Sequence, residues 1–211
     1  YALYVWSFFF GLILASVYFV GKKIGKFRWS VALLFLLGAV VAAAIAFMEP
    51  AQENASIPYL LLCGAIAMCS MILPGLSGSY VLLLMGNYHL VMIKAVSSFD
   101  LAVLIPVGIG AAAGLAAFAR LLSWVFKRFH DQTIALLTGF IFGSLAILWP
   151  WKEAVLQTFM KGEELKEKII GYDYALPDLS SMETWGALAI MFAGIVMIGL
   201  IEVTAGKLGD D

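Results

Sequence analysis

A short polar turn breaks the apolar stretch 57–92, which is about twice as long as one membrane span. The turn contains Pro74, Gly75, Ser77, Gly78 and Ser79. Proline removes a backbone donor and disfavours helix at the preceding residue, and glycine permits positive φ, so a helix is expected to break here. Irregular backbone facing lipid leaves peptide groups without hydrogen bonds, so the turn should lie inside protein or line a wet cavity. Broken helices of this kind are where transporters place binding sites.

The composition indicates a multi-pass protein of the cell membrane. Hydrophobic residues make up 63% of the chain and charged residues 13%, with a mean hydropathy of +0.98. Soluble domains are only about half apolar. The net charge of -1 gives no indication of nucleic-acid binding. Cys63 and Cys69 are six positions apart in one apolar segment, so on a helix they face different sides and are not expected to form a disulfide.

Hydropathy predicts an all-α, polytopic membrane protein in which residues 1–211 form a single transmembrane domain. The predicted spans are 2–21, 30–48, 101–122, 132–149 and 185–203, together with the interrupted stretch 57–92. The polar segment 150–184 is predicted to lie outside the membrane. Its charged residues have helical spacing, which predicts a short surface helix. These residues are Glu163, Glu164, Lys166, Glu167 and Lys168.

Lysine and arginine residues set the expected orientation of the spans. They are Lys22, Lys23, Lys26 and Arg28 after the first span, Arg120, Lys127 and Arg128 after the fourth, and Lys207 after the last. The positive-inside rule places these three ends in the cytoplasm, so 57–92 must enter and leave on the outer side. Each of its arms has about 15 residues, on the order of 22 Å of helix, which is less than the ~30 Å hydrocarbon core. We therefore expect a re-entrant hairpin that turns at 74–79.

The turn has the chemistry of an anion site. Two serine hydroxyls and the backbone N–H groups from Leu76 onwards offer hydrogen-bond donors at the start of a helix, where phosphate or carboxylate is favoured. Gly75 and Gly78 allow a bulky headgroup to approach the backbone. A purely structural interpretation is equally open, in which the turn is a Pro-Gly kink and Ser79 caps the next helix.

Few ionisable residues fall within the predicted spans. Arg120 lies near the inner end of its span, where it either snorkels to the interface or points inward and neutralises an anionic headgroup. His89 and Glu202 are candidates for coupling transport to protons or cations, although solvation at the interface explains both more simply.

Two local patterns predict structure rather than chemistry. Small residues are dense at 39–46 and 108–117, which predicts close packing between helices. Asp131 is predicted to be the N-cap of the helix that follows it.

Enzyme signatures are absent from the sequence. There is no HExxH motif, no Gly-x-Ser-x-Gly elbow and no Walker loop, and there are only two histidines. The Ser-Gly-Ser of the turn lacks the neighbouring histidine that a lipid phosphatase would need as its nucleophile. We expect no enzymatic activity, no metal and no cofactor.

Three motifs in order resemble a known membrane family. They are Leu73–Tyr88 (LPGLSGSYVLLLMGNY), Arg120–Asp131 (RLLSWVFKRFHD), and Leu137–Leu145 (LTGFIFGSL) followed by Trp149-Pro-Trp151. This order resembles the PopT-type polyprenyl-phosphate transporters, long described as a domain of unknown function. The resemblance implies return of undecaprenyl phosphate, the lipid carrier of cell-wall synthesis, from the outer to the inner leaflet.

The resemblance also implies an inverted repeat with two re-entrant hairpins, each carrying a Pro-Gly-x-Ser-Gly turn. One such turn is present, so the chain is expected to correspond to the C-terminal two-thirds of the fold, with the partner hairpin upstream of Tyr1. The chain departs from the family pattern at two points. Ser79 stands where the first-repeat turn usually has glycine, and Ala146-Ile147 replaces a basic pair, so no headgroup contact is assigned there.

The residues and the resemblance together predict a transporter of polyprenyl phosphate that has membrane lipids as further partners; a homo-oligomer is compatible with the chain. The expected substrate-binding residues are Pro74, Gly75, Ser77, Gly78, Ser79, Tyr80 and Arg120. Two alternatives use the same broken helix. One is a small-anion or ion-coupled secondary transporter, and the other is a non-transporting membrane scaffold in which the turn is only structural.

Overall fold

The computed structural model describes residues 2–26, 28–161 and 164–208, and it divides into two compact units. One unit is Tyr1–Ser16 with Leu145–Asp211, and the other is Val17–Ser144. Five helices of the described residues are long and apolar enough to cross a membrane. They confirm the expected polytopic helical membrane protein, with a two-stranded hairpin as a local exception.

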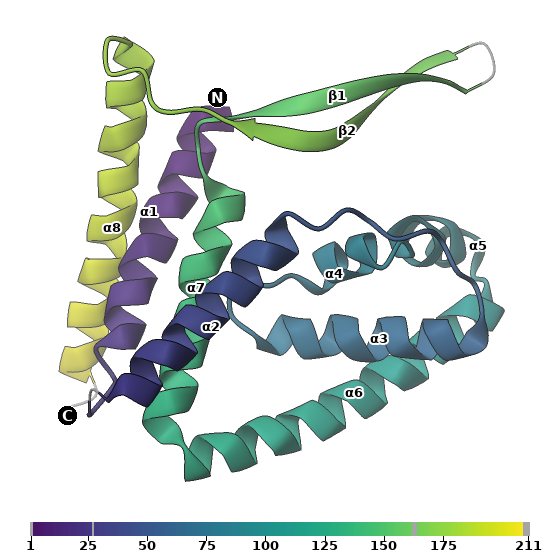
Figure 1. The fold of residues 1–211 in the computed structure, drawn as a ribbon, viewed down its shortest axis with the longest axis horizontal. Coiled ribbons are helices and arrows are strands. Elements are labelled where there is room, and N and C mark those ends of the chain that lie inside the picture. The colour runs from purple at the N-terminus through teal and green to yellow at the C-terminus, as the bar shows by residue number, and fades with distance from the viewer. Residues whose placement is uncertain (1, 27, 162–163, 209–211) are drawn as a thin grey trace. The chain divides into compact units, whose positions relative to one another are not determined.

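The unit Val17–Ser144 contains most of the helices (Figure 1). They are the end of α1 (Ala2–Gly21), α2 (Trp29–Ala46), α3 (Ile57–Ile72), α4 (Gly78–Leu84), the π-helix His89–Ala95 with α5 (Val96–Ser98), α6 (Leu101–Arg128) and most of α7 (His130–Leu148). Four predicted spans match α1, α2, α6 and α7 to within a few residues, except that α6 continues beyond the predicted end at 122 to Arg128.

Glycines bring α3 and α6 into close contact. A Cβ placed on Gly64 or Gly110 would collide with a backbone carbonyl of the other helix, and one on Gly114 would lie 2.6 Å from the Cα of Ala65. Figure 1 shows the two helices side by side. The small residues at 108–117 therefore serve helix packing, as predicted, because only glycine lets the backbones approach so closely.

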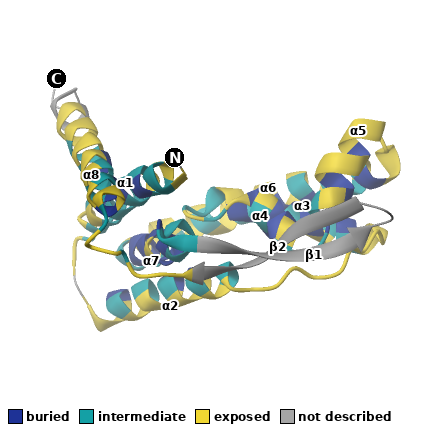
Figure 2. Cartoon of the chain, turned by 90° about the horizontal axis from the view of Figure 1, so that it is seen from above, coloured by how far each residue is buried: buried dark blue, intermediate teal, exposed yellow. Residues whose placement is uncertain are grey.

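The same arrangement joins α2 to α7. Added Cβ atoms on Gly38, Gly139 and Gly143 would each collide with a backbone carbonyl of the facing helix. Helix α7 is the most buried of the candidate spans. In its most apolar 18-residue segment 56% of the residues are buried, against 17% in those of α2 and α6. Figure 2 shows this difference in colour. The exposed faces of α2 and α6 carry large apolar side chains, as expected for helices in contact with lipid.

The stretch 57–92 forms two helical arms joined by a turn, but the arms are unequal. Helix α3 has 16 residues, close to expectation, whereas α4 has only 7. The prediction of about 15 residues for each arm was wrong for the second arm, because the chain breaks after α4 at Gly86, whose φ is +75°, and bends by 111° into the π-helix segment. Entry of this hairpin into the membrane from one side remains a prediction.

The other unit contains Ala2–Ser16 of α1, the end of α7, and α8 (Met182–Leu208). Helices α1 and α8 pack closely, because a Cβ on Gly194 would lie 2.6 Å from the Phe8 carbonyl oxygen and one on Gly11 would collide with the Met191 carbonyl. The last predicted span, 185–203, lies within α8.

The polar segment 150–184 folds differently from expectation. Strands β1 (Lys152–Lys161) and β2 (Glu164–Tyr174) pair antiparallel, with an irregularity between Val155 and Leu156. The predicted surface helix at Glu164, Lys166, Glu167 and Lys168 was wrong, and Glu163 lies outside the described residues. The spacing of the charges alone had indicated a helix, whereas the neighbouring β-branched and aromatic residues favour a strand.

Candidate functional site

Gly75 lets the predicted turn pack tightly against α7. Its φ of +88° is a conformation that glycine adopts easily and other residues rarely do. A Cβ at this position would lie 2.9 Å from both the Phe140 carbonyl oxygen and the Ser144 Oγ. The turn therefore needs glycine for its backbone conformation and for space.

The two serines of the turn point their hydroxyls at each other. Ser77 Oγ and Ser79 Oγ are 2.8 Å apart, and both residues are exposed. Ser77 precedes α4, but it makes no side-chain capping bond, and the hydroxyl of Ser79 pairs with Ser77. The alternative in which Ser79 caps the helix is therefore not observed, and the paired hydroxyls are available to a ligand.

Gly78 and Tyr80 fasten the start of α4 to its neighbours. Gly78 is buried, and a Cβ there would lie 2.7 Å from the Ala67 carbonyl oxygen of α3. The Tyr80 hydroxyl donates to the carbonyl oxygens of Ala46, at 3.2 Å, and Ile45, at 3.4 Å, at the end of α2. These contacts fix the turn between α2, α3 and α7.

A cavity of about 440 Å³ lies beside the turn. Leu76, Ser77, Gly78 and Ser79 line it from the turn and α4, and the rest of its wall is apolar. The other lining residues are Gly64, Ala67, Met68 and Met71 of α3, Leu82 of α4, Val91 and Met92 of the π-helix, and Val107 and Ala111 of α6. The cavity thus joins two hydroxyls to an apolar wall, which suits an amphipathic ligand.

Arg120 does not line this cavity. It is exposed on α6, nine residues beyond Ala111, which corresponds to roughly 13 Å along the helix. His89, at the start of the π-helix, and Glu202, near the end of α8, are exposed as well. The countercharge role of Arg120 and the coupling roles of His89 and Glu202 remain predictions.

Asn87 is a residue of this region that the sequence pattern did not reveal. It is fully buried, and its side-chain amide bonds both backbone groups of Asn54. It also donates to the Sγ of Cys63, at 3.5 Å. The sequence does contain one signal for it, a polar residue next to a glycine inside an apolar run. An amide in such a run is expected to be buried, and a buried amide needs hydrogen-bond partners. Tyr59 adds a bond from its hydroxyl to the Met85 carbonyl oxygen, at 2.9 Å.

Asp131 acts differently from the predicted N-cap. Helix α7 already begins at His130, and the Asp131 carboxylate accepts hydrogen bonds from the backbone N–H groups of Gly25 and Lys26, both at 3.1 Å. It joins the loop after α1 to the start of α7. Among the described residues, no three His, Cys, Asp or Glu side chains are placed to hold a metal ion.

A family model described as undecaprenyl phosphate translocase-like matches residues 1–165 of the 211. The chain belongs to this family. The resemblance drawn from the turn and the two later motifs is thereby confirmed, since the matched region contains all three.

Two curated relatives carry the name polyprenyl-phosphate transporter. The one from Vibrio cholerae is 36% identical over 207 residues, which are 96% of this chain and 67% of the relative. The one from Staphylococcus aureus is 29% identical over 163 residues, 68% of this chain and 56% of the relative. The matched regions thus span about two thirds and just over half of these relatives. No solved structure matches the chain.

Proposed function

We propose that this chain moves a polyprenyl phosphate lipid carrier, undecaprenyl phosphate, across the cell membrane. The observation that carries the proposal is the serine turn beside an apolar cavity, in a chain of the undecaprenyl phosphate translocase-like family. A phosphate on a long hydrocarbon chain needs polar donors next to apolar surface, and this cavity offers both.

The turn would hold the phosphate through neutral donors. The hydroxyls of Ser77 and Ser79 can each donate to a phosphate oxygen once they give up their mutual bond. Hydrogen bonds to a charged group are worth roughly 1.5–3 kcal/mol each, so two of them hold a headgroup without trapping it. Transport requires such moderate binding, because the headgroup must also leave.

The isoprenoid chain would remain in lipid while the headgroup crosses. The apolar wall of the cavity and the exposed apolar faces of α3 and α6 suit such a path, because hydrocarbon meets hydrocarbon along it. Arg120 would then act as a countercharge further along the path, not at the turn itself. A small anion would gain no binding energy from an apolar wall. The cavity therefore favours transport of a lipid phosphate over the alternative, transport of a small anion.

The proposal is tested in liposomes that contain undecaprenyl phosphate and the full-length protein. The assay follows movement of the phosphate between leaflets for the wild type, for Ser77→Ala/Ser79→Ala, and for Ser98→Ala as the matched control. Ser98 is also an exposed helical serine, but its hydroxyl bonds the Lys94 carbonyl and does not line the cavity. We expect transport to be lost in the double variant alone. Full transport by a folded double variant would refute the site, and no transport by the wild type would refute the function.

A further inference from the structure

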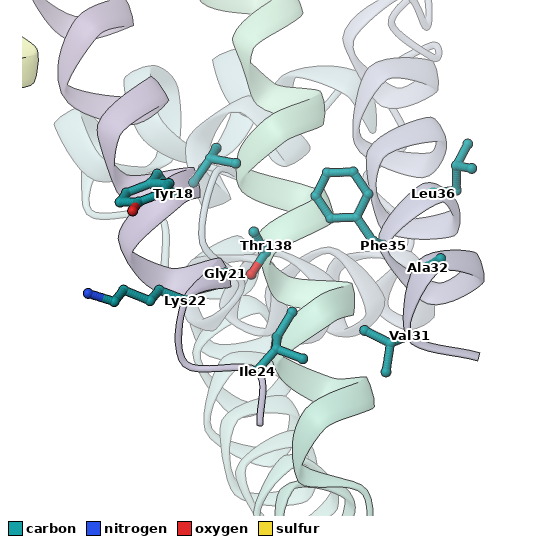
Figure 3. Close-up of a pocket in the computed structure, with 10 residues that line it drawn as sticks. Tyr18, Gly21, Lys22, Ile24, Val31, Ala32, Phe35, Leu36 and Thr138 are labelled. Carbon is teal, nitrogen blue, oxygen red and sulfur yellow. The ribbon is translucent and has the colours of Figure 1, made fainter. Parts of the chain in front are cut away.

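A second cavity, larger than the one at the turn, lies where α1 ends and α2 begins. Its volume is about 620 Å³, and its wall is formed mainly by apolar residues of α1, α2 and the loop between them (Figure 3). They include Val17, Gly21, Ile24, Ala32, Phe35 and Leu36. Thr138 of α7 also reaches the wall, but its hydroxyl already donates to the Ile134 carbonyl oxygen. The cavity therefore offers a surface for hydrocarbon.

A polar pocket adjoins this apolar cavity. Its volume is about 420 Å³, and Val31 lines both spaces. Lys26, Arg28 and Arg128 bring three cationic side chains to the polar pocket. An apolar space and a cationic space thus share one lining residue, within a single compact unit of the chain.

The cations of this pocket outnumber the carboxylates that face it. Asp131 is the acidic residue in its lining, and its carboxylate is bound by the N–H groups of Gly25 and Lys26 and lies 3.3 Å from His130 Nδ1. The lining therefore has an excess of two positive charges. Lys22 also lines the apolar cavity, and Figure 3 shows its ammonium directed away from Phe35.

We infer that the two adjoining spaces form a second binding site for the polyprenyl phosphate, separate from the serine turn. The phosphate would lie among Lys26, Arg28 and Arg128, and the first part of the isoprenoid chain would fill the apolar cavity. The inference rests on the proposed function for the identity of the lipid. Among the described residues, none lines both this site and the cavity at the turn.

The shape and charge of the site favour this lipid over a bulk phospholipid. One apolar cavity accepts one chain, whereas a phospholipid has two. A terminal phosphate monoester carries a second charge near neutral pH, and arginine side chains bind such a group through paired hydrogen bonds. The positive-inside rule places these basic residues in the cytoplasm, so the site would receive the carrier after it has crossed.

The test uses a photoreactive amino acid in place of Leu36, which lines the apolar cavity and is 58% exposed. The full-length protein in nanodiscs is illuminated with polyprenyl phosphate present, and excess polyprenyl phosphate or phosphatidylglycerol is added as competitor. We expect a cross-link that polyprenyl phosphate suppresses and phosphatidylglycerol does not. Absence of the cross-link, or equal suppression by the phospholipid, would overturn the inference.

Two variants separate this site from the turn. Arg28→Gln/Arg128→Gln should raise the polyprenyl phosphate concentration needed for half-maximal cross-linking about tenfold, because charge-assisted hydrogen bonds to the phosphate are lost. Lys94→Gln, which removes an exposed cation elsewhere, should leave it unchanged. Ser77→Ala/Ser79→Ala should lose transport yet retain the cross-link. A cross-link that survives the arginine changes unweakened would refute the headgroup assignment, even if the transport function itself stands.

Discussion

The side chain of Asn87 binds both backbone groups of Asn54. Its Nδ2 donates to the Asn54 carbonyl oxygen at 2.8 Å, and its Oδ1 accepts from the Asn54 N–H at 2.9 Å. The Asn87 side chain is fully buried, and the residue follows Gly86, which lies two residues beyond the end of α4. The loop before α3 is thereby held against the far end of α4, so one buried amide joins this loop to the arm that begins at the serine turn.

Replacing Asn87 by leucine should destabilise the protein by about 1–3 kcal/mol, because two hydrogen bonds from a buried side chain to the Asn54 backbone are lost. Thermal unfolding of the purified protein measures this. Asn54→Ala is the control. The bond to Asn87 uses the Asn54 backbone, and the Asn54 side chain only accepts from the Ser56 N–H, so the control should cost much less. Equal unfolding temperatures for Asn87→Leu and the wild type would contradict the assignment.

Replacing Gly75 by alanine should impair both folding and transport. The positive φ costs a residue with a Cβ about 1–2 kcal/mol, and the added atom would also press on Phe140 and Ser144 of α7. Gly108→Ala is the matched control, since nothing lies within 4 Å of its added Cβ. Within a helix this control should be neutral or stabilising by up to ~1 kcal/mol. If both variants behave alike in unfolding and in transport, the turn does not depend on this glycine.

The sequence indicates the helices and the turn because both depend on local composition. Apolar runs of span length predict α1, α2, α6, α7 and α8, and small residues at 108–117 predict close helix packing, which the structure shows between α6 and α3. The Pro-Gly pair predicts the end of α3, and the serines after it predict the polar wall of the cavity.

The errors arise where distant partners or subtle local signals decide the structure. The Asp131 carboxylate finds its donors at Gly25 and Lys26, more than a hundred residues away, so spacing within its own helix misassigned it as a cap. The end of α4 at Gly86 was missed because the surrounding residues are apolar enough to continue the arm. The basic pocket was missed for the same reason as Asp131, since its cations come from the loop after α1 and from the end of α6, which folding brings together.

Acid should weaken one specific loop contact before α8. The Ser180 hydroxyl and N–H both donate to Asp178, at 2.6 and 3.0 Å, and these bonds hold the pKa of the Asp178 carboxyl below its usual value. A lowered folded-state pKa gives stability that is present above the ordinary aspartate pKa and is lost as the pH falls through the lowered one.

Asp178→Asn should therefore lower the unfolding temperature at pH 7 and have no effect at a pH below the lowered pKa. Ser180→Ala removes the hydroxyl but keeps the backbone donor, so it should produce a smaller change of the same sign. Unfolding temperatures of the three proteins across this pH range provide the test. A difference for Asp178→Asn that is constant with pH would show that the carboxylate charge does not matter.

Arg120 provides a test of how the headgroup travels. It is too far along α6 to help bind at the turn, so Arg120→Gln should slow transport while leaving the unfolding temperature unchanged. Arg120→Lys keeps the charge but loses the planar pair of donors, and it should restore only part of the rate. Lys127→Gln, an exposed cation near the end of the same helix, is the control.

The two interpretations of Arg120 give opposite results in this experiment. If the side chain only snorkels to the interface, then Arg120→Gln and Lys127→Gln should both leave the transport rate as it is, because either position tolerates an uncharged polar residue. If Arg120 neutralises the passing phosphate, only its own replacement slows transport, and the cross-link from position 36 is retained, as it should be for Ser77→Ala/Ser79→Ala, because that site takes up lipid without transport.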